Sequence, residues 1–439
     1  MSDSEPASAA SRAADPIPLV IVEGFLGGAG PFLWGNFHSY CDPDGQLEAG
    51  EPRRKVIFAS IGPVSSLHDR ACELYYTLKG GTVDYGAEHS QASRHARYGR
   101  YHSSGLYPEW SPEKPVHFIG HSMGGPTVTK LQWLLGSGFF GKSETPDMVL
   151  SLVTVSSPFR GTQAVYTLGE RTEGAPRVRP FSVGSFLTKG VHIASYLSPH
   201  MPSFLDMHAD ARSLSYMTTT FREFTRLLRQ SNWGESRDAA PFDVTFEAAD
   251  LREANGEGLP YPRTFYRSYA ASMTSVDAAT TKSDKPSMRY ALLNPPLFVL
   301  SSAISSYDFS YIKPSPSVIN VHHPRRSRRS SRSGPNRDAL RANDGIVPVL
   351  SQWHPLNCSE TTCRHWPREP AVPQDFSDLP DPVPGLWDVF EVPDATHISL
   401  VPFWYGTARQ RAFWGSVGRW LREIDHQVAA EGFGEASLA

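Results

Sequence analysis

A serine flanked by glycines is the residue of this chain whose setting points most directly to chemistry. Gly120-His121-Ser122-Met123-Gly124-Gly125 has the GxSxG form, follows the apolar run 116–119 and precedes a helical pattern over 127–135. Small neighbours allow a sharp strand-to-helix turn that presents the central hydroxyl. The spacing therefore predicts a nucleophile elbow with Ser122 as the nucleophile.

A serine nucleophile also needs a base and an acid, because its hydroxyl reacts poorly until a neighbouring group takes the proton. In elbows of this kind the acid and then the histidine follow the serine along the chain. Asp344 lies in the turn 343–348, and His397 follows a predicted strand at 389–392. We select Asp344 as the acid and His397 as the base. Among the 16 histidines, the rivals for the base are His354 and His365.

The negative oxygen of a tetrahedral intermediate needs backbone N–H donors, which form an oxyanion hole. One donor in such elbows is the residue after the serine, which is Met123 here. The second comes from the loop after the first strand. The glycine-rich stretch Glu23–Gly28 fits that loop, with Phe25 as the donor. A tight glycine turn without a catalytic role is the alternative for this stretch.

Short β-branched runs alternate with amphipathic stretches along the chain, a rhythm that favours a mostly parallel sheet flanked by helices. One helix is expected over 65–78 and another over 408–428, where apolar residues recur at helical spacing. The expected strands cover 17–22, 55–60, 116–119, 148–155, 264–270 and 389–392.

The predicted domain organisation is one large domain over 17–430 after a disordered tail at 1–16. About a hundred residues within 160–260 read largely as helix and loop, which predicts an inserted helical cap. The apolar face of 181–197 fits a lid helix or an ordinary packed helix. The Arg/Ser-rich stretch 322–340 is expected to be a flexible insertion, with nuclear targeting or an acidic partner as alternatives.

The composition is that of a globular protein. Of the 439 residues 40% are hydrophobic and 20% charged, and a net charge of −3 gives no general attraction to nucleic acid. No apolar run nears the roughly 20 residues of a membrane-spanning helix, so any lipid contact would be peripheral. The first residues do not resemble a secretory signal, which favours a cytoplasmic location. Cys358 and Cys363 either pair in a small loop or remain free thiols.

With these residues in place, the chain resembles the large zinc-containing lipases of thermophilic bacilli and their staphylococcal relatives. The resemblance is densest over 17–162, and its most specific strings are Ile61–Ser66, Asp69–Cys72 and Gly80–Gly86. It implies an α/β-hydrolase fold and strengthens Asp344 and His397 as acid and base. The implied activity is hydrolysis of carboxylic esters, above all triacylglycerols, through an acyl-enzyme and without an organic cofactor.

The resemblance also implies a structural zinc ion held by two aspartates and two histidines. The matching positions are Asp69, His89, His95 and Asp243. Two imidazoles and two carboxylates can fill a tetrahedral shell and leave no open position. Spacing alone would favour ordinary surface histidines.

Two departures from that family are visible. Glu23 stands where the family has a histidine before the oxyanion-loop glycine, and the residues just after His397 include no carboxylate. We therefore expect the family's calcium site to be absent. The departures leave alternatives open: an esterase, thioesterase or acyltransferase acting on a specialised ester, or an inactive lipase-like binding protein.

Overall fold

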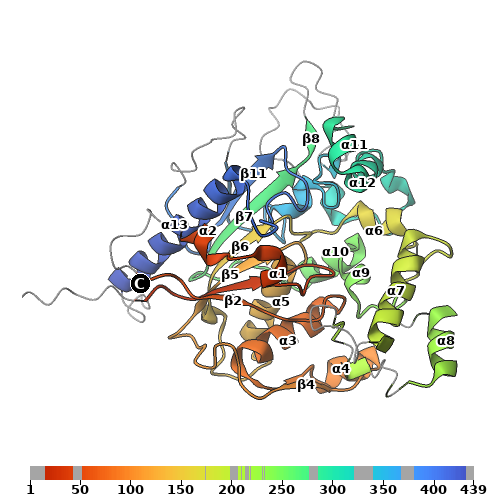
Figure 1. Ribbon diagram of the computed structural model, residues 1–439, viewed down its shortest axis with the longest axis horizontal. Coiled ribbons are helices and arrows are strands. Elements are labelled where there is room, and N and C mark those ends of the chain that lie inside the picture. Colours follow the sequence, from red (N-terminus) through yellow and green to blue (C-terminus); the bar gives the residue numbers. More distant parts are fainter. Residues whose placement is uncertain are drawn as a thin grey trace, which may run out of the picture.

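Seven parallel strands form the centre of the molecule in the computed structural model, in the spatial order β10-β11-β7-β6-β5-β1-β2 (Figure 1). In that order they cover Cys363–His365, Trp387–Pro393, Phe265–Ser272, Val149–Val155, Val116–His121, Leu19–Val22 and Val56–Phe58. The structure describes residues 15–42, 52–173, 175–197, 206–208, 210–212, 217, 219–229, 231, 233–275, 285–320, 340–366 and 380–431.

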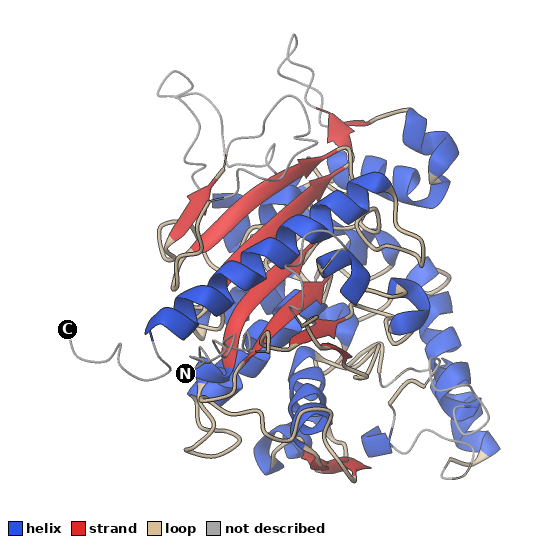
Figure 2. Ribbon diagram, turned by 60° about the vertical axis from the view of Figure 1, so that its left-hand side comes forward, coloured by secondary structure: helices blue, strands red, loops and turns tan. Residues whose placement is uncertain are grey.

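Helices cover both faces of this sheet, which explains why the central strands β5, β6 and β7 are buried almost throughout. In β1, Leu19 and Ile21 pack with α13 (Ala408–Glu431), whereas Val20 and Val22 pack with α3 (Leu67–Lys79) and α5 (Gly124–Gly136). Successive side chains of a strand point to opposite faces, so all four are buried. Figure 2 shows α13, the long helix nearest the C-terminus, lying across the sheet.

The predicted parallel sheet flanked by helices is confirmed. The helix expected over 65–78 is α3, which begins after Ser66, whose hydroxyl accepts a hydrogen bond from the Asp69 N–H. The helix expected over 408–428 is α13. The sequence did not predict β10 or two short antiparallel pairs. These pairs are β3 (Gly81–Asp84) with β4 (Tyr98–His102), and β8 (Thr274–Ser275) with β9 (Lys285–Pro286).

The stretch predicted as a helical cap lies between β6 and β7, and its described residues include α-helices joined by loops. Its helices are α6 (Gln163–Leu168), α7 (Val183–Leu197), α8 (Phe221–Arg229), α9 (Ala240–Asp243) and α10 (Phe246–Ala254). The remaining α-helices of the described chain are α1 (Pro31–Trp34), α2 (His38–Cys41), α4 (Ala87–Ser93), α11 (Arg289–Leu293) and α12 (Pro295–Ser305). In Figure 1, α7 and α8 stand at the side of the molecule, away from α13.

Two predicted segments lie almost wholly outside the described residues. Only residues 15 and 16 of the predicted tail and residue 340 of the predicted Arg/Ser-rich insertion are described. All four cysteines carry free thiols. Across the described ranges, none of the helices combines the length and the apolar character that crossing a membrane requires.

Candidate active site

Ser122 occupies the sharp turn between β5 and α5. Its φ of 54° lies in the left-handed region, which a residue with a side chain adopts only when its surroundings hold it there. One such restraint is the Ser122 N–H, which donates to the carbonyl oxygen of Val155 at the end of β6 (2.9 Å). The strained turn predicted from the GxSxG string is therefore present.

The glycines of the turn allow backbone contacts that no other residue could make. A Cβ on Gly120 would lie 2.4 Å from the backbone nitrogen of Gly125. A Cβ on Gly124 would lie 1.9 Å from the carbonyl oxygen of Val22. Since real Cβ contacts are longer than this, side chains here would force the turn away from β1.

The structure brings Ser122, His397 and Asp344 into one hydrogen-bonded series. His397 Nε2 lies 3.0 Å from Ser122 Oγ, and His397 Nδ1 lies 2.9 Å from Asp344 Oδ2. The backbone N–H of His397 also donates to the Asp344 carbonyl oxygen (2.8 Å). The rival bases His354 and His365 belong to a different group of side chains.

Asp344 is held as a fixed acceptor. Its side chain is fully buried, and Oδ1 accepts the backbone N–H groups of Ile346 (2.9 Å) and Val347 (2.7 Å). The Gln352 amide donates to the carbonyl oxygens of Val347 and Ala271, and it accepts the Ala271 N–H. The acid turn is thereby fastened to β7, while Oδ2 remains directed at His397.

His121, inside the elbow, supports the backbone of His397. Its Nε2–H donates to the His397 carbonyl oxygen (2.9 Å). Burial disfavours the imidazolium, and together with the nearby His397 it lowers the pKa of His121 from 6.5 to about 4. His121 is therefore neutral at pH 7, with its proton on Nε2.

The predicted oxyanion loop is organised by Glu23. The Glu23 carboxylate accepts the N–H groups of Gly28 (2.7 Å) and Gly30 (3.0 Å) and the indole N–H of Trp34 (3.0 Å). The following glycine touches the nucleophile, because a Cβ on Gly24 would lie 2.5 Å from Ser122 Cβ. The residue that departs from the resembled family thus fixes the loop beside Ser122.

An apolar pocket of about 140 Å³ opens at Ser122. Both predicted oxyanion donors, Phe25 and Met123, line it beside the serine. Apolar side chains from the stretch between β6 and β7 complete the wall, among them those of Val165, Leu168, Val178, Leu187 and Val244. The hydroxyl therefore faces a space suited to a hydrocarbon chain.

Three of the four predicted metal ligands lie together, but the fourth member of the group is Asp238 and not the predicted Asp243. Asp69, His89, His95 and Asp238 each direct one ligand atom into a group whose atoms lie within 4.8 Å of one another. The prediction of Asp243 was wrong, because its Oδ2 accepts the Leu67 N–H (2.7 Å) instead. Asp243 ends α9 and points to the start of α3, whereas Asp238 precedes α9 and reaches the histidines.

The chemistry of this group fits a metal ion. His89 Nε2 lies 3.1 Å from Asp69 Oδ1 and 3.2 Å from Asp238 Oδ1, and His95 Nε2 lies 3.3 Å from Asp238 Oδ2. Ligands about 2.0 Å from a tetrahedral ion lie about 3.3 Å apart. His95 Nδ1 donates to the Ala96 carbonyl oxygen, which leaves the buried Nε2 without a hydrogen-bond partner. Four protein ligands would fill a tetrahedral shell and leave no position for water or substrate, which is typical of a structural metal site.

Comparisons with known proteins agree with this fold. The family model described as "Lipase-like, C-terminal domain" matches residues 15–304. The chain is 30% identical to a Staphylococcus hyicus lipase over 283 residues, covering 58% of this chain and 40% of that protein. It is 26% identical to lipase 1 of Staphylococcus aureus (strain MRSA252) over 396 residues, covering 82% of this chain and 51% of that protein.

The crystal structure of the S. hyicus lipase superimposes with a TM-score of 0.69 at 23% identity, covering 96% of this chain and all of that one. This likeness confirms the α/β-hydrolase fold, and the relatives confirm the resemblance to staphylococcal lipases. The chain spans about half or less of the length of the curated relatives that it matches.

Metal content distinguishes the two candidate aspartates. Asp238→Asn should lower the bound metal by about one equivalent per chain, because it removes one of four ligands from a closed shell. Asp243→Asn is the matched control and should leave the metal content unchanged. Inductively coupled plasma mass spectrometry of protein purified without chelator measures both. Loss of metal in Asp243→Asn alone would reinstate the sequence-based assignment.

The low pKa of His121 predicts a dependence of stability on pH. Between pH 6.5 and about 4 the unfolded chain protonates this imidazole and the folded chain does not, so stability falls as the pH falls. In His121→Gln, the unfolding free energy from urea titrations should therefore change less steeply across this window than in the wild type. Equal slopes for the two proteins would mean that His121 is not held neutral.

Proposed function

The chain belongs to the family of lipase-like C-terminal domains, and from that premise we propose that it hydrolyses carboxylic esters, most of all triacylglycerols, through an acyl-enzyme. One observation carries this proposal: the series Ser122, His397 and Asp344 is complete and opens directly onto an apolar pocket. A serine hydroxyl beside a base and beside apolar space is the arrangement that acyl transfer to water needs.

In the proposed reaction, Ser122 Oγ attacks the ester carbonyl carbon while His397 Nε2 takes the hydroxyl proton. The carbonyl oxygen becomes negative and accepts hydrogen bonds from the backbone N–H groups of Phe25 and Met123. His397 then gives its proton to the departing alcohol, the carbon–oxygen bond breaks, and Ser122 carries the acyl group. Water repeats the sequence, with His397 as base, and releases the acid and the free serine.

Asp344 has two tasks in this sequence. Its hydrogen bond to Nδ1 fixes the histidine tautomer whose Nε2 is free to accept the serine proton. Its negative charge then stabilises the imidazolium, which forms in buried surroundings that otherwise disfavour it. The two N–H groups at Oδ1 keep the carboxylate in place while the charge moves.

The surroundings of the pocket favour a long acyl chain and contact with lipid. Leu187 of α7 lines the pocket, while other apolar side chains of that helix and its approach are exposed. Phe181 is 90% exposed and Phe186 62% exposed, and Ile193 and Leu197 are also exposed. A helix that faces both the pocket and solvent with apolar side chains supports peripheral contact with a lipid surface.

We further propose that zinc is the ion held by Asp69, His89, His95 and Asp238. Nitrogen and carboxylate donors in a closed tetrahedral shell suit this ion, whose part would be structural. Asp69 belongs to α3, His89 to α4, and Asp238 precedes α9. The ion would therefore tie the stretch between β6 and β7 to a helix of the core, without touching Ser122.

An ester chain-length series tests the reaction and the substrate class together. Nitrophenyl esters with long acyl chains should give a higher kcat/KM than acetate, because the pocket buries the chain. Ser122→Ala should lower kcat/KM by about 10³-fold or more for every ester. The exposed Ser103 provides the control, Ser103→Ala, which should match the wild type. Activity of Ser122→Ala equal to the wild type would refute the proposal.

Glu23 should influence the rate through the oxyanion loop rather than through substrate binding. In Glu23→Gln one of the two acceptor oxygens becomes an NH₂ donor. The amide can therefore no longer accept all three of the N–H groups that the carboxylate accepts. We expect kcat to fall by about 10- to 100-fold with little change in KM. Glu109→Gln, at an exposed glutamate, is the control. If Glu23→Gln keeps the wild-type kcat, the loop does not depend on this carboxylate.

A further inference from the structure

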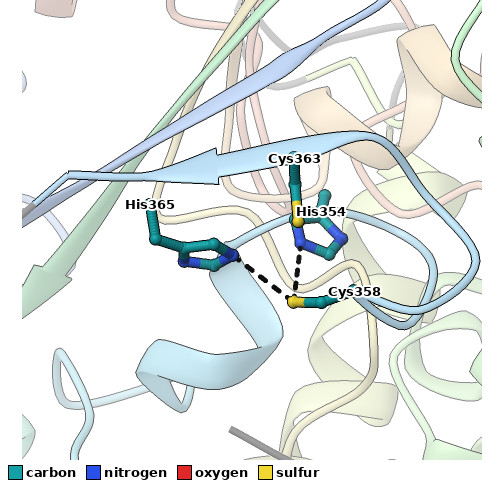
Figure 3. Close-up of side chains that lie close together, drawn as sticks. All are labelled: His354, Cys358, Cys363 and His365. Atoms are coloured by element: carbon teal, nitrogen blue, oxygen red, sulfur yellow. Dashed lines mark hydrogen bonds between the residues drawn. The ribbon is translucent and has the colours of Figure 1, made fainter. Parts of the chain in front are cut away.

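Two cysteines and two histidines converge at the edge of the sheet, in a group that contains neither the catalytic residues nor the Asp69 and His89 ligands. Each of His354, Cys358, Cys363 and His365 offers one ligand atom, and these atoms all lie within 4.8 Å of one another. Figure 3 shows the four side chains turned toward a common point. None of them takes part in the proposed hydrolysis, so the group needs an explanation of its own.

The backbone explains why these side chains meet. Cys363 and His365 are two residues apart on β10, so they share one face of that strand. His354 follows the short helix η8 (Val349–Gln352), and the loop from there to β10 carries Cys358. Strand β10 pairs with β11, with His365 opposite Val389. This pairing fixes the positions of the Cys363 and His365 side chains relative to the sheet.

The distances match a tetrahedral ion of mixed sulfur and nitrogen ligands. Cys358 Sγ lies 3.5 Å from His354 Nε2 and 3.4 Å from His365 Nε2. With metal–sulfur bonds of about 2.3 Å and metal–nitrogen bonds of about 2.0 Å, a tetrahedron separates sulfur and nitrogen by about 3.5 Å. The Cys358 sulfur therefore lies at tetrahedral separations from both imidazoles, and the Cys363 sulfur lies within 4.8 Å of the other three ligand atoms.

We propose that the His/Cys group, formed by His354, Cys358, Cys363 and His365, binds a second structural zinc ion. This ion is distinct from the one proposed for the Asp/His group, formed by Asp69, His89, His95 and Asp238. Two thiolates balance the charge of the ion, and sulfur donors favour zinc over magnesium or calcium. Four protein ligands leave no position for water or substrate, so the site has a structural part to play and not a catalytic one. This proposal does not rest on the proposed function.

A disulfide between Cys358 and Cys363 is the competing arrangement. Both are free thiols in the structure, and the imidazoles of His354 and His365 both face the Cys358 sulfur. A disulfide would join the two sulfurs but would not explain why both imidazoles lie beside Cys358. Zinc uses all four groups.

The position of the site shows what an ion would stabilise. Strand β10 has only three residues and forms one edge of the sheet, so its pairing with β11 is a weak anchor. Just before His354, Gln352 fastens the turn that carries Asp344 to β7. Zinc would therefore join the edge strand to the segment that supports the acid, and its loss should lower the melting temperature.

Cobalt substitution of the 439-residue chain tests the site, because only a thiolate ligand gives a sulfur-to-cobalt charge-transfer band. The protein is purified under reducing conditions without chelator, and metal content is measured before and after exchange. We expect about two zinc ions per chain in the wild type and about one in Cys358→Ser/Cys363→Ser. The charge-transfer band should be present in the wild type and absent in this double variant.

Asp238→Asn is the matched control, since it removes one ligand of the other group. It should also bind about one zinc ion per chain while retaining the full charge-transfer band. If the double cysteine variant fails to fold, the wild type and Asp238→Asn still decide the matter by metal count and spectrum. A cobalt-loaded wild type without the band would overturn the proposal. So would a Cys358–Cys363 disulfide found by mass spectrometry in the reduced preparation.

Discussion

The close contact of backbone with backbone at the elbow is the constraint on which the rest of the site depends. Gly124 lies against the carbonyl oxygen of Val22 so tightly that no side chain would fit, and Ser122 is held at a φ of 54°. Because β1 and β5 are neighbours in register, with Val22 opposite Gly120, the loop after β1 arrives directly beside the serine. Glu23 then fixes that loop by accepting three N–H groups.

The parallel sheet delivers the other groups to the same edge, since carboxyl ends of parallel strands lie together. His397 follows β11, and the turn of Asp344 is bonded to the end of β7 through the Met273 N–H and the Asn343 carbonyl oxygen (2.9 Å). The Asp/His group and the His/Cys group lie outside this constellation, one before α9 and one at β10. Positioning and chemistry are thus separated: ions would stabilise the supports, while three side chains and two backbone N–H groups would act on the ester.

The parallel sheet and the Ser122, His397 and Asp344 site could largely be predicted from local sequence patterns and from the family resemblance. The GxSxG string after an apolar run located Ser122, and chain order with the family resemblance located Asp344 and His397. Local pattern could not choose between Asp238 and Asp243, because one precedes α9 and the other ends it, and only the packing of α9 decides which carboxylate reaches the two histidines. Local pattern also does not reveal the His/Cys group: it offers the two histidines as rival bases and the two cysteines as thiols that either pair or stay free. Cys363-Arg364-His365 has no apolar alternation, so nothing marks it as a strand until β11 provides a partner.

If Ser122 is a nucleophile activated by His397, a reagent that reacts with activated serines should label it covalently. Diethyl p-nitrophenyl phosphate phosphorylates an activated serine and releases a coloured phenolate, so labelling can be followed by absorbance and located by peptide mass spectrometry. We expect a diethylphosphoryl group on Ser122 at about one per chain, and very slow labelling in His397→Ala. Absence of the label from folded wild-type protein, its location on another residue, or equal rates in both proteins would contradict it.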